Sequence, residues 1–178
     1  GSFAMTRFRT GERMRQTIAA DLSECAGAPV AVTLDPDVTI DTLPGTCIDA
    51  LDVECAEWDV DAGLLEADAA EEVEERLHSH LLRSLCPITG QPDIGSVLVS
   101  YTGPRIDPAS LLRYIVSFRE HNDFHEACVE RMFSDIEAQC RPRALSVHAL
   151  YQRRGGIDIN PFRTNCDEVP RNLRLWRQ

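Results

Sequence analysis

The chain has 178 residues, which is enough for one well-packed core or for one domain and part of another. With 43% hydrophobic residues, no signal peptide and no apolar run near the roughly 20 residues that cross a bilayer, it is not expected to be a membrane protein. The formal net charge of −11 argues against direct binding to nucleic acid, because phosphate binding needs a basic face.

The N-terminal residues predict a helix followed by a short strand. Thr10 is a good N-cap, Gly27 is a stop signal, and apolar residues between them recur at a spacing of four: Met14, Ile18 and Leu22. We therefore expect a helix over residues 10–25. The β-branched run at residues 28–34 predicts a strand.

The next segment, residues 35–68, is expected to connect two modules. It is turn-rich, and residues 35–75 hold fifteen acidic residues and no basic one. Such a run is most simply a solvated face that aids solubility. One or two short strands are expected within the segment.

The remaining residues contain six predicted elements. Residues 71–85 fit a helix by propensity and by the spacing of their apolar residues. The same apolar residues would also lie on one face of a strand, in which side chains alternate between two faces. Downstream, the pattern predicts a strand ended by Gly103-Pro104, two helices, and a closing hairpin around Gly155-Gly156: residues 95–102, 107–121, 124–139, and 145–152 with 157–162.

Residues 84–96 are dense in residues that break helices and strands: Pro87, Gly90, Pro92 and Gly95. A compact turn here can fold back, so that Cys86 and Asp93 face one pocket as a sulfur nucleophile and a proton donor. A free cysteine of ordinary pKa is only about 3% thiolate at neutral pH, so a reactive one needs help from its surroundings. The other interpretations are an inert buried thiol and a turn aspartate that caps a backbone N–H.

The cysteine and lysine content of the chain excludes several kinds of catalytic and binding site. All 18 basic residues are arginine, which excludes a Schiff-base lysine and a phosphate-loop lysine. Seven cysteines without a repeating framework indicate free thiols in a reducing cytoplasm. No two cysteines form a Cys-x-x-Cys pair, and His78 and His80 lack a convincing cysteine ligand set, so no metal site is expected.

Three motifs follow one another in the second half of the chain. They are Cys-Pro-Ile-Thr-Gly-Gln-Pro-Asp (86–93), Tyr-Ile-Val-Ser-Phe-Arg-Glu-His-Asn-Asp-Phe-His-Glu (114–126) and Arg-Arg-Gly-Gly-Ile-Asp-Ile-Asn-Pro-Phe-Arg (153–163). Together they closely resemble the NADPH-dependent 7-cyano-7-deazaguanine reductase (QueF) family. The best match is to the C-terminal catalytic half of the long, two-module form of that family.

The resemblance implies an α+β tunnelling fold, in which a ββααββ module forms an antiparallel sheet. It favours a strand over residues 71–85. It also implies a remnant of a first module at residues 1–45, a connector at residues 46–68 and a catalytic module at residues 69–178. Because subunits of this fold pair their sheets side by side, a homo-oligomer that forms through sheet edges is expected.

The family's reaction converts 7-cyano-7-deazaguanine to 7-aminomethyl-7-deazaguanine with two NADPH, in the biosynthesis of queuosine, a tRNA modification. On the resemblance, Cys86 is the nucleophile that forms a thioimide with the nitrile, and Asp93 is the general acid. The resemblance assigns substrate binding to Phe124, His125 and Glu126, and dinucleotide contacts to Arg154 and Gly155. From the residues alone, Phe124 fits a buried core position about equally well, and Arg154 with Gly155 fits a plain hairpin turn.

A second signature of the family, roughly Glu-Ser-Lys-Ser-hydrophobic-Lys-Leu-Tyr, supplies NADPH contacts. The corresponding residues 107–114 keep only Ser110, Leu111 and Tyr114, and the chain begins with residues that match the sequence just after an intact copy. The cofactor site of this chain alone is therefore expected to be incomplete. Two alternatives stay open: an amidine-forming transferase that uses the same thioimide without NADPH, and an inactive catalytic-half fragment.

Overall fold

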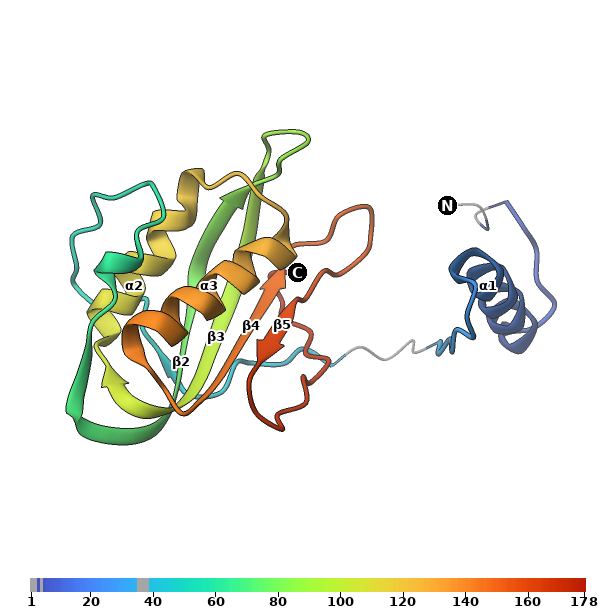
Figure 1. The fold of residues 1–178 in the computed structure, drawn as a ribbon. Helices are drawn as coiled ribbons and strands as arrows, with labels where there is room; N and C mark the ends of the chain where they lie inside the picture. The colour runs from blue at the N-terminus through green and yellow to red at the C-terminus, as the bar shows by residue number, and fades with distance from the viewer. Residues whose placement is uncertain (1–2, 4, 35–38) are drawn as a thin grey trace. The chain divides into compact units, whose positions relative to one another are not determined.

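The computed structural model of the chain describes residues 3, 5–34 and 39–178 (Figure 1). The chain separates into two compact units, Gly1–Thr39 and Ile40–Gln178. Among the described residues, no helix combines the length and the apolar character needed to cross a membrane. The first unit carries helix α1, and the second carries the sheet and the candidate site.

Helix α1, Gly11–Ala26, forms where the sequence predicts it. Thr10 caps its first turn, because the Thr10 hydroxyl accepts a hydrogen bond from the backbone N–H of Arg13 at 3.1 Å. Gly27 ends the helix in the left-handed conformation, with a φ of 65°, which glycine adopts without a Cβ clash.

The predicted strand over residues 28–34 is wrong, because these residues form no strand. β-branched side chains favour an extended backbone, but a strand also needs a neighbouring backbone with which it can exchange hydrogen bonds. Here the partners are side chains of α1 instead. Ser23 Oγ accepts from the Val30 N–H at 2.9 Å, and Arg15 Nη1 donates to the Val32 carbonyl at 3.4 Å.

The second unit is an α+β fold built on a five-stranded sheet with the strand order β1-β2-β3-β4-β5. In chain order, the strands are Thr46–Cys47, Ala67–Leu85, Pro92–Ile106, Ala144–Tyr151 and Phe162–Thr164. β1 is parallel to β2, and the other neighbours are antiparallel. A short 3₁₀ helix, η1 (Ala62–Leu64), precedes β2. Residues 71–85 thus belong to a strand, as the resemblance implies.

Two helices connect β3 to β4 and lie on one face of the sheet (Figure 1). Helix α2, Pro108–Ser117, begins after Asp107, whose carboxylate accepts from the Ser110 N–H at 2.8 Å. The 3₁₀ helix η2, Phe118–Glu120, then leads to helix α3, His125–Cys140. The order from β2 to β5 is ββααββ, which confirms the predicted α+β fold class.

Alternation along the strands divides the side chains of the sheet between two faces. One row in register belongs to the main core with the helices: Leu77, Val99 and Val147. The next row points to the opposite face: His78, Leu98 and His148. A smaller cluster on that face includes residues of the C-terminal segment: Leu43, Leu98, Leu150, Leu173 and Leu175. The C-terminal segment therefore covers the face that the helices leave open.

Strand β3 continues past Gly103-Pro104, where the sequence predicts its end. Pro104 still pairs with Glu72 of β2. The reason for a glycine here is a close approach of the connection between α3 and β4, because a Cβ on Gly103 would lie 2.7 Å from Pro142 Cα. This glycine therefore marks a packing contact rather than a stop signal.

The second strand of the closing hairpin is shorter than predicted, since β5 begins at Phe162 and not at Ile157. The turn itself is as expected: Gly155 and Gly156 have φ of 59° and 83°, which is typical of a type I′ turn. Pro161 has no N–H to donate, so the ladder is interrupted before Phe162.

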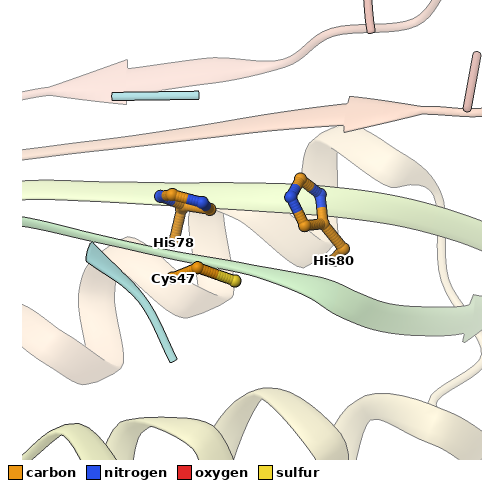
Figure 2. Close-up of side chains that lie close together, drawn as sticks. All are labelled: Cys47, His78 and His80. Carbon is orange, nitrogen blue, oxygen red and sulfur yellow. The ribbon is translucent and has the colours of Figure 1, made fainter. Parts of the chain in front are cut away.

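The short strand β1 fixes one edge of the sheet. In the parallel ladder, Thr46 pairs with Leu77 and Cys47 pairs with His78. Because alternate residues of a strand share a face, His80 lies on the same side as His78. Cys47, His78 and His80 therefore come together (Figure 2). Strand pairing, and not sequence spacing, supplies the cysteine that the two histidines lack in the sequence.

Replacing Gly103 with alanine is expected to destabilise the second unit. The new Cβ would meet backbone that cannot move freely, and overpacking of this kind costs about 1–3 kcal/mol. Gly90→Ala is the matched control, because Gly90 also has a positive φ but has no atom within 4 Å of the new Cβ. Urea denaturation should give the lower free energy of unfolding for Gly103→Ala. Equal losses in the two variants would contradict the close approach.

Candidate active site

The turn between β2 and β3 brings Cys86 and Asp93 to one pocket, as the motif predicts. The backbone N–H of Cys86 donates to the Gln91 carbonyl at 2.9 Å, and the N–H of Gly90 donates to the Cys86 carbonyl at 2.8 Å. Gly90 has a φ of 66°, a left-handed conformation that glycine adopts readily. The chain therefore reverses within a few residues, and its polar groups are satisfied locally.

This active-site pocket has a volume of about 330 Å³. Six of the residues that the sequence singles out line it: Cys86, Asp93, Phe124, His125, Glu126 and Arg154. The other lining residues are Pro87, Thr89 and Ile159. Gly155 does not line the pocket and lies next to Arg154 in the type I′ turn.

Asp93 is the buried charge at the centre of the site, with only 4% of its side chain exposed. Its Oδ2 lies 3.1 Å from Nε2 of His125. Its Oδ1 accepts a hydrogen bond from Nε of Arg154 at 2.7 Å and a second one from Nη2. A buried carboxylate needs such partners, because an unpaired charge is costly away from water. Both carboxylate oxygens of Asp93 therefore have a polar partner within the protein.

His125 is held in a fixed plane. Its ring stacks on Tyr151 with a centroid distance of 3.9 Å and an angle of 5° between the planes. Both side chains are buried. The stack aims Nε2 at Asp93, so a proton can be exchanged between the imidazole and the carboxyl group.

Phe124 and Glu126 flank His125 at the N-terminal end of α3. Phe124 is 55% exposed, so the interpretation as a core residue is wrong, and its ring is free to stack on a planar base. Glu126 is exposed in the first turn of the helix, where the helix dipole favours a carboxylate. This end of α3 thus presents an aromatic face and an anionic group to the pocket.

The surroundings of Cys86 favour its thiolate. Hydrogen bonds lower the pKa of Cys86, and the largest contribution is that of the Thr89 hydroxyl, followed by the backbone of Ile88 and Thr89. Burial and the charge of Asp93 raise the pKa and oppose this effect. By contrast, burial raises the pKa of Cys128, and it raises that of Cys140 to about 11. Cys86 is only half-buried, so the interpretation as a walled-off thiol is wrong.

Arg154 is engaged with the protein itself. Its Nε contacts Asp93, and its Nη1 donates to Oε1 of Gln91 at 2.9 Å. The side chain is 35% exposed, so it closes the pocket over Asp93 from the solvent side. A dinucleotide phosphate would have to share this guanidinium with Asp93, and the dinucleotide contact of Arg154 and Gly155 stays a prediction.

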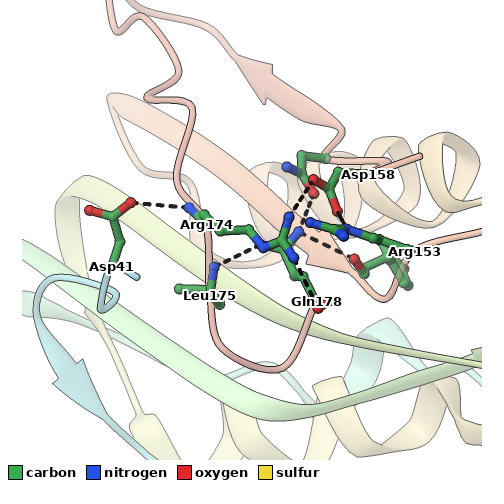
Figure 3. A network of polar contacts seen from close by, with 8 residues as sticks. Asp41, Arg153, Asp158, Arg174, Leu175 and Gln178 are labelled. Carbon is green, nitrogen blue, oxygen red and sulfur yellow. Dashed lines mark hydrogen bonds and ion pairs between the residues drawn. The ribbon is translucent and has the colours of Figure 1, made fainter. Parts of the chain in front are cut away.

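A polar network braces the turn that carries Arg154 (Figure 3). Arg153 Nε donates to Asp158 Oδ1 at 3.0 Å, and Arg174 Nη1 donates to Asp158 Oδ2 at 3.3 Å. The backbone N–H of Arg174 in turn donates to Oδ2 of Asp41 at 3.1 Å. The position of Arg154 therefore depends on contacts from the C-terminal segment.

From the sequence, no function is assigned to three residues that the structure places at or beside the site: Thr89, Gln91 and Tyr151. Thr89 and Gln91 lie inside the motif at residues 86–93, and their short separation from Cys86 in a tight turn is a signal that could have found them. Tyr151 ends β4, and only its register opposite Gly95 shows that it lies beside the site.

Residues 92–170 match the family model described as QueF-like protein. These residues are therefore similar to QueF-like proteins. The matched range holds Asp93, the start of α3 and the Arg154 turn, and it begins after Cys86.

Two known proteins are similar to this chain. The chain is 48% identical to the NADPH-dependent 7-cyano-7-deazaguanine reductase of Hydrogenovibrio crunogenus, over 181 aligned residues that cover 99% of the chain. It spans 65% of the length of that relative. A crystal structure of the archaeosine synthase QueF-Like in the apo form is similar with a TM-score of 0.47 and 19% identity, over 59% of this chain and 100% of that chain. The similarity to the curated reductase and the match to the QueF-like family model agree with the resemblance seen in the motifs.

Alkylation of Cys86 by iodoacetamide should have its midpoint at a lower pH than an ordinary thiol shows, because hydrogen bonds stabilise the thiolate. Thr89→Val removes the largest of these contributions, so the midpoint should move to higher pH. Thr89→Ser keeps the hydroxyl and should restore the midpoint.

Peptide mass spectrometry across a pH series measures each site separately. Cys128 is the internal control, because burial raises its pKa and it should label only at more alkaline pH. If Thr89→Val left the midpoint of Cys86 unchanged, the proposed cause of thiolate stabilisation would be wrong.

Proposed function

We propose that this chain is the catalytic part of a nitrile reductase that converts 7-cyano-7-deazaguanine to 7-aminomethyl-7-deazaguanine with two NADPH. The observation that carries the proposal is one pocket lined by Cys86, whose thiol pKa is lowered, and by the buried Asp93–His125 pair. The 48% identity to the reductase of Hydrogenovibrio crunogenus supports the same substrate and cofactor.

The first step is attack of the Cys86 thiolate on the nitrile carbon. A C–S bond forms, one carbon–nitrogen π bond breaks, and its electron pair takes a proton at nitrogen, which gives a thioimide. The pair of Asp93 and His125 is placed to deliver this proton, because Asp93 Oδ2 and His125 Nε2 lie 3.1 Å apart and both residues line the pocket. The covalent step replaces a weakly reactive linear carbon with one that accepts a hydride more readily.

NADPH, when bound, supplies one hydride to each of two carbon–nitrogen double bonds. After the first addition the C–S bond breaks, so that sulfur returns to Cys86 and an imine remains, and after the second addition the product is the primary amine. Starting from the thiolate, the reaction takes up two protons at nitrogen, one when the thioimide forms and one when the second hydride adds to the imine. A proton that the Asp93–His125 pair donates can be replaced from solvent through the imidazole. The pair can therefore act as the donor each time a proton is needed.

The residues at the mouth of the pocket suit the two ligands. Glu126 can accept two N–H groups from the pyrimidine edge of a deazaguanine, and Phe124 can stack on its ring. Gly155 has no atom within 4 Å of its missing Cβ, so its backbone is open to a dinucleotide that lies close to the turn. Arg154 would add a forked cation beside it.

The wider setting of the reaction follows from the same resemblance. We place the activity in queuosine biosynthesis in the cytoplasm, acting on the free base and not on tRNA, in line with the net charge of −11. The organisation into residues 1–45, 46–68 and 69–178 belongs to this proposal. So does a homo-oligomer through sheet edges, since β1 has two residues and β5 has three, and such short strands leave their neighbours open to pairing.

Incubation of the purified chain with 7-cyano-7-deazaguanine is expected to add the mass of one substrate molecule to Cys86, as read by intact-protein and peptide mass spectrometry. Cys86→Ala should form no adduct. Cys166→Ala is the matched control, because Cys166 is exposed and lies outside the pocket, and it should form the adduct normally. A wild-type chain without adduct, or an adduct that survives Cys86→Ala, would contradict the proposal.

The same sample separates the alternatives when NADPH is added. Slow consumption is expected, because residues 107–114 keep little of the cofactor signature. An amidine-forming transferase would form the adduct and consume no NADPH, and an inactive fragment would do neither. Rapid NADPH oxidation would contradict the expected incomplete cofactor site while supporting the reductase itself.

A further inference from the structure

The edge of the sheet at β1 and β2 holds a cluster of metal-binding side chains outside the active-site pocket (Figure 2). One donor atom from each of Cys47, His78 and His80 lies within 4.8 Å of those from the other two. A tetrahedral Zn²⁺ with bonds of about 2.0–2.3 Å keeps its nitrogen and sulfur ligands about 3.3–3.6 Å apart. Small side-chain rotations would therefore close the three ligands around one ion.

Both histidines have a partner for one ring nitrogen, which is typical of histidines that bind metal. Nδ1 of His78 lies 3.0 Å from the Pro44 carbonyl. A carbonyl can only accept, so Nδ1 of His78 carries the hydrogen and Nε2 keeps a free lone pair. Nδ1 of His80 lies 2.7 Å from Oγ of Ser96, which can play the same part.

The backbone that carries the cluster is already organised. The N–H of His80 donates to the Asp49 carboxylate, at 3.0 Å to Oδ2, and Ser79 Oγ donates to Asp49 Oδ1 at 2.6 Å. The N–H of Ile48 donates to the His78 carbonyl at 3.0 Å. These contacts fix the residues on either side of the ligands, so little order has to be created when an ion binds.

The solvent exposure of the cluster and the charged residues beside it allow a bound ion to keep one open coordination position. Cys47 is exposed whereas His78 is buried, so the cluster faces solvent on the cysteine side. Arg177 lines the cavity beside the two histidines and opposes a cation, whereas Asp49 adjoins them with the opposite charge. A thiolate with two imidazoles selects Zn²⁺ and related transition metals over Mg²⁺ and Ca²⁺.

We propose that Cys47, His78 and His80 bind one Zn²⁺ ion at this edge, with a water molecule in the fourth position. Cys47 loses its proton to solvent on binding, because the thiolate is the metal ligand. Since Cys47 comes from β1 and both histidines come from β2, the ion ties the two-residue strand to the rest of the sheet. The inference does not depend on the nitrile reductase proposal, because it uses none of those residues.

Titration of the chelator-treated chain with CoCl₂ tests the site, because tetrahedral Co²⁺ reports a bound thiolate by a charge-transfer band and by intense visible absorption. One Co²⁺ per chain is expected, and ZnCl₂ should displace it. Cys47→Ser should abolish the charge-transfer band and weaken Co²⁺ binding by at least about tenfold. Ser96→Ala, which removes the partner of His80, should weaken binding by about 10–100-fold and keep the band.

Cys166→Ser is the matched control, since Cys166 is another exposed cysteine, and it should leave the titration unchanged. Thermal unfolding gives a second readout: ZnCl₂ should raise the midpoint of the wild-type chain and of Cys166→Ser, but not that of Cys47→Ser. Absence of the charge-transfer band in the wild-type chain, or its survival in Cys47→Ser, would overturn the proposal.

Discussion

The site depends on one buried carboxylate that must be paired. Asp93 is almost wholly removed from water, and its two oxygens are held by Arg154 and by His125. These partners come from the type I′ turn after β4 and from the first residue of α3, while Asp93 lies at the start of β3. Three separate segments must therefore meet before the charge is satisfied, and Cys86 lies on the turn that adjoins them.

The two faces of the sheet support this arrangement in different ways. The helix face supplies the main core and fixes the start of α3, which carries Phe124, His125 and Glu126. The opposite face is covered by the C-terminal segment, whose Arg174 links Asp158 near the Arg154 turn to Asp41. The partners of Asp93 are thus positioned from both sides of one sheet.

Local signals were the ones that could be predicted from the sequence. The caps of α1, the turn from Cys86 to Asp93 and the type I′ turn are each specified within a few residues, and each forms as expected. The strand expected over residues 28–34 does not form, because extended propensity supplies no partner backbone. The stack of Tyr151 on His125 and the approach of Cys47 to His78 arise from tertiary packing and strand pairing between distant residues, so no spacing in the sequence indicates them.

The central claim is that the buried Asp93–His125 pair supplies the proton when the Cys86 thiolate adds to a nitrile. The most direct measurement is the rate of adduct formation with 7-cyano-7-deazaguanine in Asp93→Asn, followed by mass spectrometry. The account predicts a rate slower by about 10²–10⁴-fold, the usual contribution of a positioned acid. Alkylation of Cys86 by iodoacetamide should be no slower in this variant, because the charge that opposes the thiolate is gone. An adduct rate equal to that of the wild-type chain would contradict the account.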